Sequence, residues 1–138
     1  MKPLYVLLAL LVISCAKQDP ESQKQFLSGY WEIENVTLAD GTEKTYNVNT
    51  DIDYISITGD SGTRKKMKPQ LDGSFITNQA AEEFTLTIEN KKLRLNYKTP
   101  YSSWQETILE AEDSVMVVEN QDGNIYKYKK FRGFDLNL

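Results

Sequence analysis

The feature that most constrains this chain is a repeated alternation between apolar runs and Asp-Gly turns. Three Asp-Gly pairs separate runs that are rich in β-branched and aromatic residues, at Asp40-Gly41, Asp72-Gly73 and Asp122-Gly123. Asp-Gly is among the strongest hairpin signals, because both positions tolerate a positive φ. The chain is therefore expected to fold through antiparallel hairpins.

Within the runs, apolar and polar side chains alternate. Phe84, Leu86 and Ile88 share one face of a strand, while Thr85 and Thr87 share the other. Such strands have one dry face and one wet face. The pattern predicts strands and no helix from residue 26 onward, with strands near residues 30–38, 43–48, 53–58, 63–70, 74–77, 83–89, 92–98, 104–111, 114–120 and 124–131.

The first strand changes its parity. The apolar face contains the odd positions Trp31 and Ile33 and then the even positions Val36 and Leu38. This switch predicts a bulge near residues 34 and 35. Sequential hairpins with one apolar face close into an up-and-down barrel, because closure removes exposed sheet edges. The predicted fold class is all-β, a small antiparallel barrel of about eight strands over residues 26–138. A barrel of that size is filled by its own side chains or holds one small ligand.

Residues 1–14 are typical of an export signal. Lys2 precedes a nearly unbroken apolar run from Leu4 to Ile13. The run gives only about 15 Å of helix, half of a bilayer core, so it is predicted to be a signal peptide rather than a membrane span. Residues 16–25 have no aliphatic side chain larger than alanine. With Cys15, they are predicted to form a flexible tether of about 17 Å.

The end of the apolar run, Val12-Ile13-Ser14-Cys15, resembles the bacterial lipobox. The resemblance implies that the chain is cut before Cys15, and that Cys15 carries acyl groups such as palmitate and anchors the domain to a membrane. The alternative is an ordinary signal peptide that contains a cysteine. Cys15 is the only cysteine, so no internal disulfide competes for it. Ala16 rather than aspartate follows it, which favours the outer membrane, with the domain facing the periplasm or the cell surface.

The stretch LSGYWEIENV, residues 27–36, resembles the Gly-x-Trp signature of lipocalins and related calycin barrels, and more closely that of short bacterial lipocalin-like lipoproteins. The stretch ILEAEDSVMVVENQDGNIYKYKKF, residues 108–131, resembles the last hairpin of the same family. The resemblance implies that Gly29 and Trp31 close the narrow end of the barrel. It also implies that Lys130 or Arg132 lies across the Trp31 indole.

Composition excludes several kinds of chemistry. The chain has no histidine, which excludes Ser-His-Asp and Cys-His catalysis and disfavours transition-metal sites. Glu106, Glu110 and Glu112 form a carboxylate cluster that is better interpreted as a solvated strand face than as an acid-base pair. We therefore expect no enzyme activity, cofactor or metal. A net charge of −4 disfavours nucleic acid as a partner.

Two features remain as binding candidates. The run from Arg64 to Lys68 places three cations on one strand face, either to bind an anionic partner or to deter edge pairing. The second feature is aromatic. The candidate ligand-binding residues are Tyr97, Trp104, Tyr126 and Tyr128, which are expected to converge at one rim of the barrel. Such side chains suit pocket mouths and barrel cores alike.

Two functions are consistent with this pattern. The first is a membrane-anchored, lipocalin-like lipoprotein of a Gram-negative envelope that binds a small apolar or amphiphilic ligand inside the barrel. The second is an interaction module, in which a solid barrel docks to another envelope protein or to a surface glycan. The volume of any internal cavity separates the two.

Overall fold

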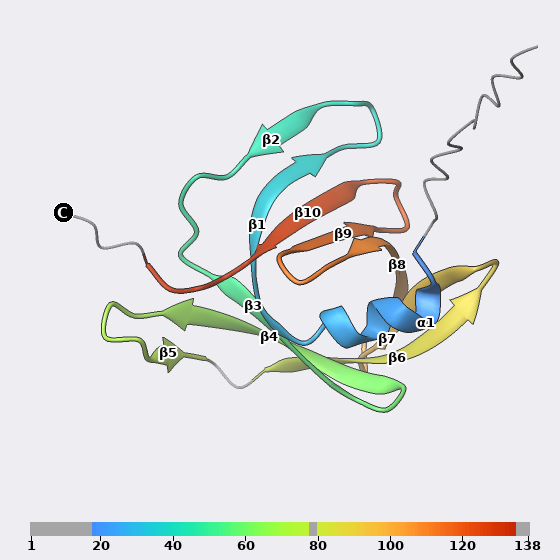
Figure 1. The fold of residues 1–138 in the computed structure, drawn as a ribbon, viewed down its shortest axis with the longest axis horizontal. Helices are drawn as coiled ribbons and strands as arrows, with labels where there is room; N and C mark the ends of the chain where they lie inside the picture. The colour runs from blue at the N-terminus through green and yellow to red at the C-terminus, as the bar shows by residue number, and fades with distance from the viewer. Residues whose placement is uncertain (1–17, 78–79, 135–138) are drawn as a thin grey trace, which may run out of the picture.

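The computed structural model describes residues 18–77 and 80–134, so the predicted signal peptide and Cys15 lie outside the described residues. The described chain is almost entirely strand and turn (Figure 1). No helix in this part of the chain has the length and apolar character needed to cross a membrane.

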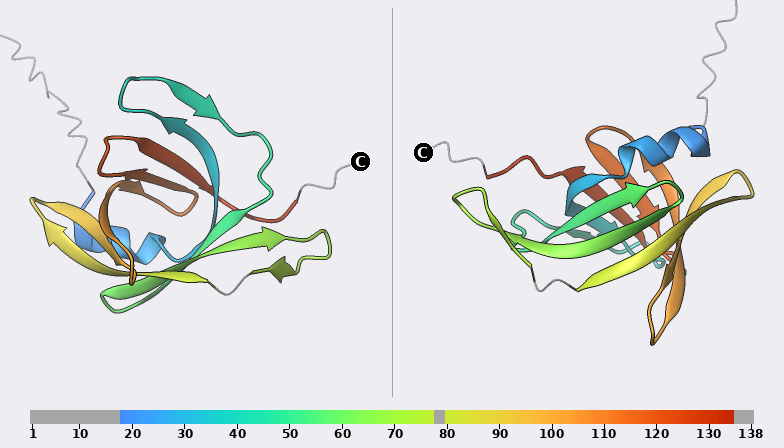
Figure 2. Two further views of the ribbon diagram at one scale, coloured as in Figure 1. Left: turned by 180° about the vertical axis from the view of Figure 1, so that it is seen from behind. Right: turned by 90° about the horizontal axis from the view of Figure 1, so that it is seen from below.

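Eight of the strands form a closed antiparallel barrel (Figure 2). They are β1 (Gly29–Thr37), β3 (Ile52–Thr58), β4 (Ser61–Pro69), β6 (Ala81–Glu89), β7 (Lys92–Lys98), β8 (Ser103–Ala111), β9 (Val115–Glu119) and β10 (Ile125–Lys130). Each strand pairs with the next one along the chain, and β10 pairs back with β1. The predicted up-and-down barrel is confirmed. Two short strands lie outside the ring: β2 (Glu43–Thr45) pairs with β1, and β5 (Phe75–Ile76) pairs with β4.

The alternating pattern places an apolar face inside the barrel in every barrel strand except β4. In β6, Phe84 and Leu86 are buried while Thr85 between them is exposed. Ile88 departs from the prediction, because it lies at the end of β6 and is 45% exposed. The buried side chains form one continuous core, to which every barrel strand except β4 contributes.

The predicted bulge in β1 is present, because the register between β1 and β10 shifts between Ile33 and Asn35. The Asp-Gly turns differ from the prediction. Only the glycines have a positive φ, as at Gly41 with φ of +91°, and the aspartates do not. The Asp40 carboxylate instead accepts a hydrogen bond from the backbone N–H of Thr42 at 2.8 Å. The two consecutive residues with positive φ are Asn90 and Lys91, in the turn between β6 and β7.

The predicted flexible tether is wrong for the residues that the structure describes. Residues 18–26 lie against one end of the barrel and contain helix α1 (Pro20–Gln23) and the 3₁₀ turn η1 (Lys24–Phe26). Asp19 caps α1 through a hydrogen bond to the N–H of Glu21, with proline at the next position, which is a favourable helix start.

Gln18 attaches this segment to the end of β8. Its amide nitrogen donates to the Ala111 carbonyl at 2.7 Å, and its amide oxygen accepts from the Ala111 N–H at 2.9 Å. Gln23 is also buried and donates to Gln18 at 3.1 Å. The polar composition predicted a solvated coil, but Gln18 pairs with the backbone N–H and carbonyl of Ala111, and Gln23 contacts the Gln18 amide.

Trp31 closes the end of the barrel that carries α1. Its side chain is fully buried, and its indole N–H donates to the Leu27 carbonyl at 2.9 Å. The Lys130 ammonium lies 4.3 Å from the indole centroid and donates to the Ser28 carbonyl at 3.1 Å. Gly29 has a φ of +132°, and a Cβ there would lie 2.6 Å from the Lys130 nitrogen. The positive φ, which residues with a side chain rarely adopt, explains the glycine two residues before the tryptophan, and the absent Cβ leaves room for the Lys130 nitrogen.

Arg132 does not cover the indole. Its guanidinium contacts the Asp113 carboxylate at 3.3 Å, and both side chains are mostly exposed. The sequence predicted that Lys130 or Arg132 covers the Trp31 indole, and in the structure it is Lys130.

Replacing Trp31 by alanine is expected to lower the free energy of unfolding by about 3–5 kcal/mol, because it empties a large buried site. Chemical denaturation measures this difference. Tyr101→Ala is the control, because Tyr101 is 97% exposed. An unchanged denaturation midpoint for Trp31→Ala would contradict the assigned role.

Candidate functional site

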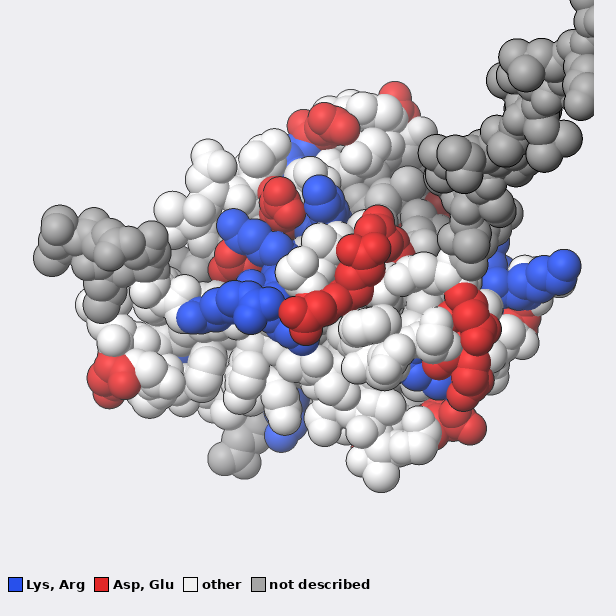
Figure 3. All heavy atoms as spheres, viewed as in Figure 1, with Lys and Arg blue, Asp and Glu red and all other residues white. Residues whose placement is uncertain are grey.

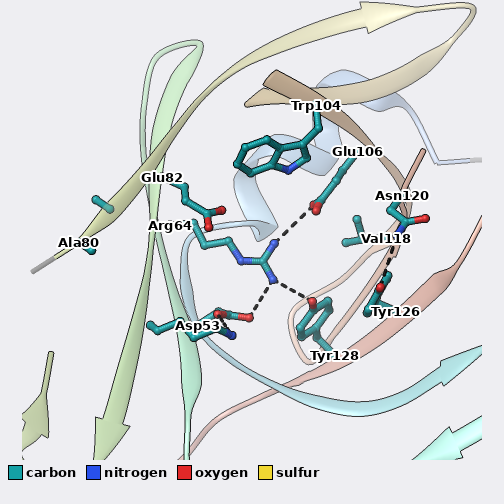
Figure 4. Close-up of a pocket in the computed structure, with 12 residues that line it drawn as sticks. Asp53, Arg64, Ala80, Glu82, Trp104, Glu106, Val118, Asn120, Tyr126 and Tyr128 are labelled. Carbon is teal, nitrogen blue, oxygen red and sulfur yellow. Dashed lines mark hydrogen bonds and ion pairs between the residues drawn. The ribbon is translucent and has the colours of Figure 1, made fainter. Parts of the chain in front are cut away.

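A cavity of about 510 Å³ lies in the barrel at the end away from α1. Trp104, near the start of β8, contributes to its wall, whereas Ala111, at the far end of the same strand, contacts Gln18. Most of the lining side chains come from β3, β4, β6, β8, β9 and β10, and Ala80 and Asn120 lie just outside β6 and β9 (Figure 4). The closed end and the cavity therefore occupy opposite ends of one barrel.

The cavity has two kinds of wall. One is aromatic and aliphatic, formed by Trp104, Val118, Tyr126 and Tyr128. The other is charged, formed by Asp53, Arg64, Lys66, Glu82 and Glu106. Figure 4 shows the Arg64 guanidinium projecting from the charged wall, with Trp104 and Glu106 on one side of it and Asp53 on the other.

Arg64 organises the polar groups. Its Nη2 donates to Asp53 and to the Tyr128 hydroxyl, both at 2.8 Å. Its Nη1 makes two longer contacts of 3.4 Å, to the Tyr97 hydroxyl and to Glu106. Burial opposes the charge, but these oxygens outweigh that effect and raise the pKa of Arg64. The guanidinium therefore stays charged inside the barrel.

The two carboxylates on Arg64 have opposite pKa shifts. Burial alone would raise the pKa of Asp53, but Arg64 and then Lys66 outweigh burial and hold it below its ordinary value. Burial also dominates at Glu106, where the more distant Arg64 contact does not compensate and Glu82 adds repulsion, so its pKa is raised. Asp53 is thus a well-paired anion, and Glu106 is a poorly compensated one.

The expectation that the three cations of the run from Arg64 to Lys68 share one exposed strand face is wrong for Arg64. The Arg64 side chain is only 14% exposed, whereas that of Lys66 is 75% exposed. The charge pattern alone did not distinguish them. On the face seen in Figure 3, basic and acidic side chains are interspersed, with no segregated cationic patch.

The expected solvated carboxylate cluster is wrong at Glu106, which faces the cavity. Glu106 has the same strand parity as Trp104 and Ile108, and Asp53 has the same parity as Ile55 and Ile57. A charged residue within an apolar alternation is therefore the signal that identifies these two. Arg64 carries no such signal, because its neighbours of equal parity are Gly62 and Lys66.

The four predicted ligand-binding aromatics separate into two groups. Trp104, Tyr126 and Tyr128 line the cavity. Tyr97 does not, because it is 2% exposed and lies behind Trp104, with stacked rings whose centroids are 5.0 Å apart. Tyr97 supports the wall and does not form its surface.

A second hollow, of about 950 Å³, lies between β4, β6 and β7. Serine, threonine and other small polar residues provide much of its lining, as with Thr63 and Thr85. None of the buried charged residues lines it. Among residues 18–77 and 80–134, no cluster of acidic side chains has the arrangement of a metal site.

The two carboxylates are expected to respond in opposite ways to neutralisation. Asp53→Asn should lower the free energy of unfolding at neutral pH by about 1–3 kcal/mol, because Arg64 loses its closest anion. Glu106→Gln should raise it, because the ionised carboxylate is penalised by burial. Thermal melts over a pH series measure both changes.

The pH dependence follows from the direction of each shift. The lowered pKa of Asp53 contributes stability that is lost as the pH falls through its folded-state value. The raised pKa of Glu106 means that its penalty is present at neutral pH and relieved on acidification. The changes in the free energy of unfolding caused by Asp53→Asn and by Glu106→Gln should therefore both become smaller at acidic pH. A loss of stability in Glu106→Gln at neutral pH would contradict this assignment.

The chain is similar to a lipocalin-like protein from Bacteroides uniformis, with 14% identity over 76% of this chain and 98% of that one, and a TM-score of 0.48. It is also similar to lobster apocrustacyanin A1, with 12% identity over 84% of this chain and 67% of that one, and a TM-score of 0.47. No curated protein matches. The family model described as a lipocalin-like domain matches residues 27–118, more than half of the chain, and the chain therefore belongs to the lipocalin-like domain family.

Proposed function

We propose that this protein is a lipid-anchored binding protein that holds a small amphiphilic molecule in its barrel. The lipocalin-like fold is typical of proteins that bind small ligands. The observation that carries the proposal is the cavity of about 510 Å³. That volume lies within the range of about 300–1,000 Å³ found for small-molecule sites.

The two walls favour an amphiphile over a purely apolar molecule. Trp104, Val118 and Tyr126 offer apolar area on one side. Asp53 and Arg64 place charges on the other, and burying them under a hydrocarbon without replacing their contact with water is unfavourable. A ligand with one apolar part and one polar part satisfies both walls.

The interaction module has less support. It requires a solid barrel, whereas this barrel contains a cavity. Arg64, one of the cations that could have served its docking face, is buried. The anchor is supported by the lipobox sequence that ends at Cys15, within a signal-like segment. Both parts of the proposal are testable separately.

Binding is expected to change the fluorescence of Trp104, which lines the cavity. Trp31→Phe makes Trp104 the only tryptophan, because the chain has two. In that background, Val118→Phe should weaken binding of a fluorescent alkyl amphiphile at least about tenfold by filling the cavity. Val117→Phe is the matched control, because Val117 directly precedes Val118 in β9 and does not line the cavity. Equal affinities in the two variants would contradict a ligand site inside the barrel.

The anchor predicts incorporation of labelled palmitate into the full-length chain. Cys15→Ser should abolish the labelling and move the protein from the membrane fraction to the aqueous fraction. Ser14→Ala is the control, since alanine is also small enough for the lipobox. Membrane association that is independent of Cys15 would contradict acylation at this position.

A further inference from the structure

The charges around the cavity indicate the chemical class of its ligand, an inference that rests on the proposed binding function. Arg64 is the buried cation, but its terminal nitrogens are already engaged by protein oxygens. Asp53 and Tyr128 lie 2.8 Å from Nη2, and Tyr97 and Glu106 lie 3.4 Å from Nη1. A ligand carboxylate or phosphate would have to displace one of these groups, and a displaced carboxylate would remain buried without its partner.

Carboxylates outnumber cations in the cavity wall. Asp53, Glu82 and Glu106 are present with Arg64 and Lys66. The Lys66 side chain is 75% exposed, and its ammonium contacts Asp53 at 3.4 Å. Glu82 is exposed as well, so the inner part of the wall carries Asp53 and Glu106 against the single positive charge of Arg64. This excess of negative charge repels an anionic ligand group and attracts a cationic one.

Glu106 is the carboxylate best placed to receive such a group. Its side chain is 17% exposed, and its ion pair with Arg64 is long. Among the described residues, Oε2 makes this contact and Oε1 has no hydrogen-bond partner. Burial raises the pKa of Glu106 despite Arg64, consistent with a carboxylate that lacks sufficient positive charge nearby.

The adjacent aromatic wall suits the same ligand group. Figure 4 shows the Trp104 indole beside Glu106, and both project from β8 toward the cavity. Tyr97 stacks on Trp104 and holds the ring in place. A cation within about 6 Å of an aromatic face is attracted to it. Glu106 and Trp104 together therefore offer two attractive contacts to one ammonium group.

We infer that the cavity takes an amphiphile with a protonated amine at its polar end, bound by Glu106 beside Trp104, and that it discriminates against carboxylate and phosphate ends. The alkyl part then lies along Val118 and Tyr126, which line the same cavity. A buried arginine without partners would favour an anionic ligand. Arg64 does not, because protein oxygens already contact both of its terminal nitrogens.

The test compares dodecylamine, dodecanol and dodecanoate below their critical micelle concentrations at neutral pH. The Trp31→Phe protein reports binding through Trp104. Dodecylamine is expected to bind at least about tenfold tighter than dodecanol, as a charge-assisted hydrogen bond allows, and dodecanoate is expected to bind more weakly than dodecanol.

Glu106→Gln should reduce the ratio of amine to alcohol affinity about tenfold, because it removes the anionic acceptor. Glu110→Gln is the matched control, since Glu110 is on the same strand and does not line the cavity, and it should leave all three affinities unchanged. Tighter binding of dodecanoate than of dodecylamine, or an unchanged ratio in Glu106→Gln, would overturn the inference and leave the binding function intact. Failure of all three molecules to bind would overturn both.

Discussion

The structure depends on the pairing of β1 with β10, which closes the sheet into a barrel. Without that pairing both strands would have unpaired edges, and the apolar faces would have no common interior. The closing register places Trp31 opposite Lys130, so the tryptophan and its cation lie on the strands that complete the ring. On the outer surface, Lys129 and Glu32 pair across the same seam at 3.1 Å. The strand pairing, the contact of Lys130 with Trp31 and the ion pair of Lys129 with Glu32 therefore all stabilise the closed barrel at this seam.

The barrel interior changes character along its axis. Near α1 it is filled by apolar side chains such as Trp31, Leu93 and Met116. Toward the other end, Arg64 and Asp53 replace hydrocarbon and the packing leaves a cavity. A buried ion pair is a weak source of stability compared with well-packed apolar side chains. In the proposed binding function, the pair instead forms the polar part of the ligand site.

Much of the fold could be predicted from local pattern, and much of the site could not. Alternation, as in Phe84 and Leu86, fixes which face of a strand is buried, and this sufficed for the barrel and for the bulge in β1. The role of Arg64 depends on strands distant in the sequence, which bring Asp53, Glu106 and Tyr128 around it. The tether prediction failed over residues 18–25 for the same reason, since Gln18 bonds to Ala111, which is distant in the sequence.

The attachment of Gln18 to β8 also affects how the protein is oriented on a membrane. If Cys15 is acylated, only residues 16 and 17 separate the anchor from a fixed point on the barrel, a reach of about 10 Å. The end sealed by Trp31 then rests near the bilayer surface, and the mouth of the cavity is directed away from it. A ligand would consequently be exchanged with the aqueous space or with a facing partner, and not by lateral diffusion within the leaflet that holds the anchor.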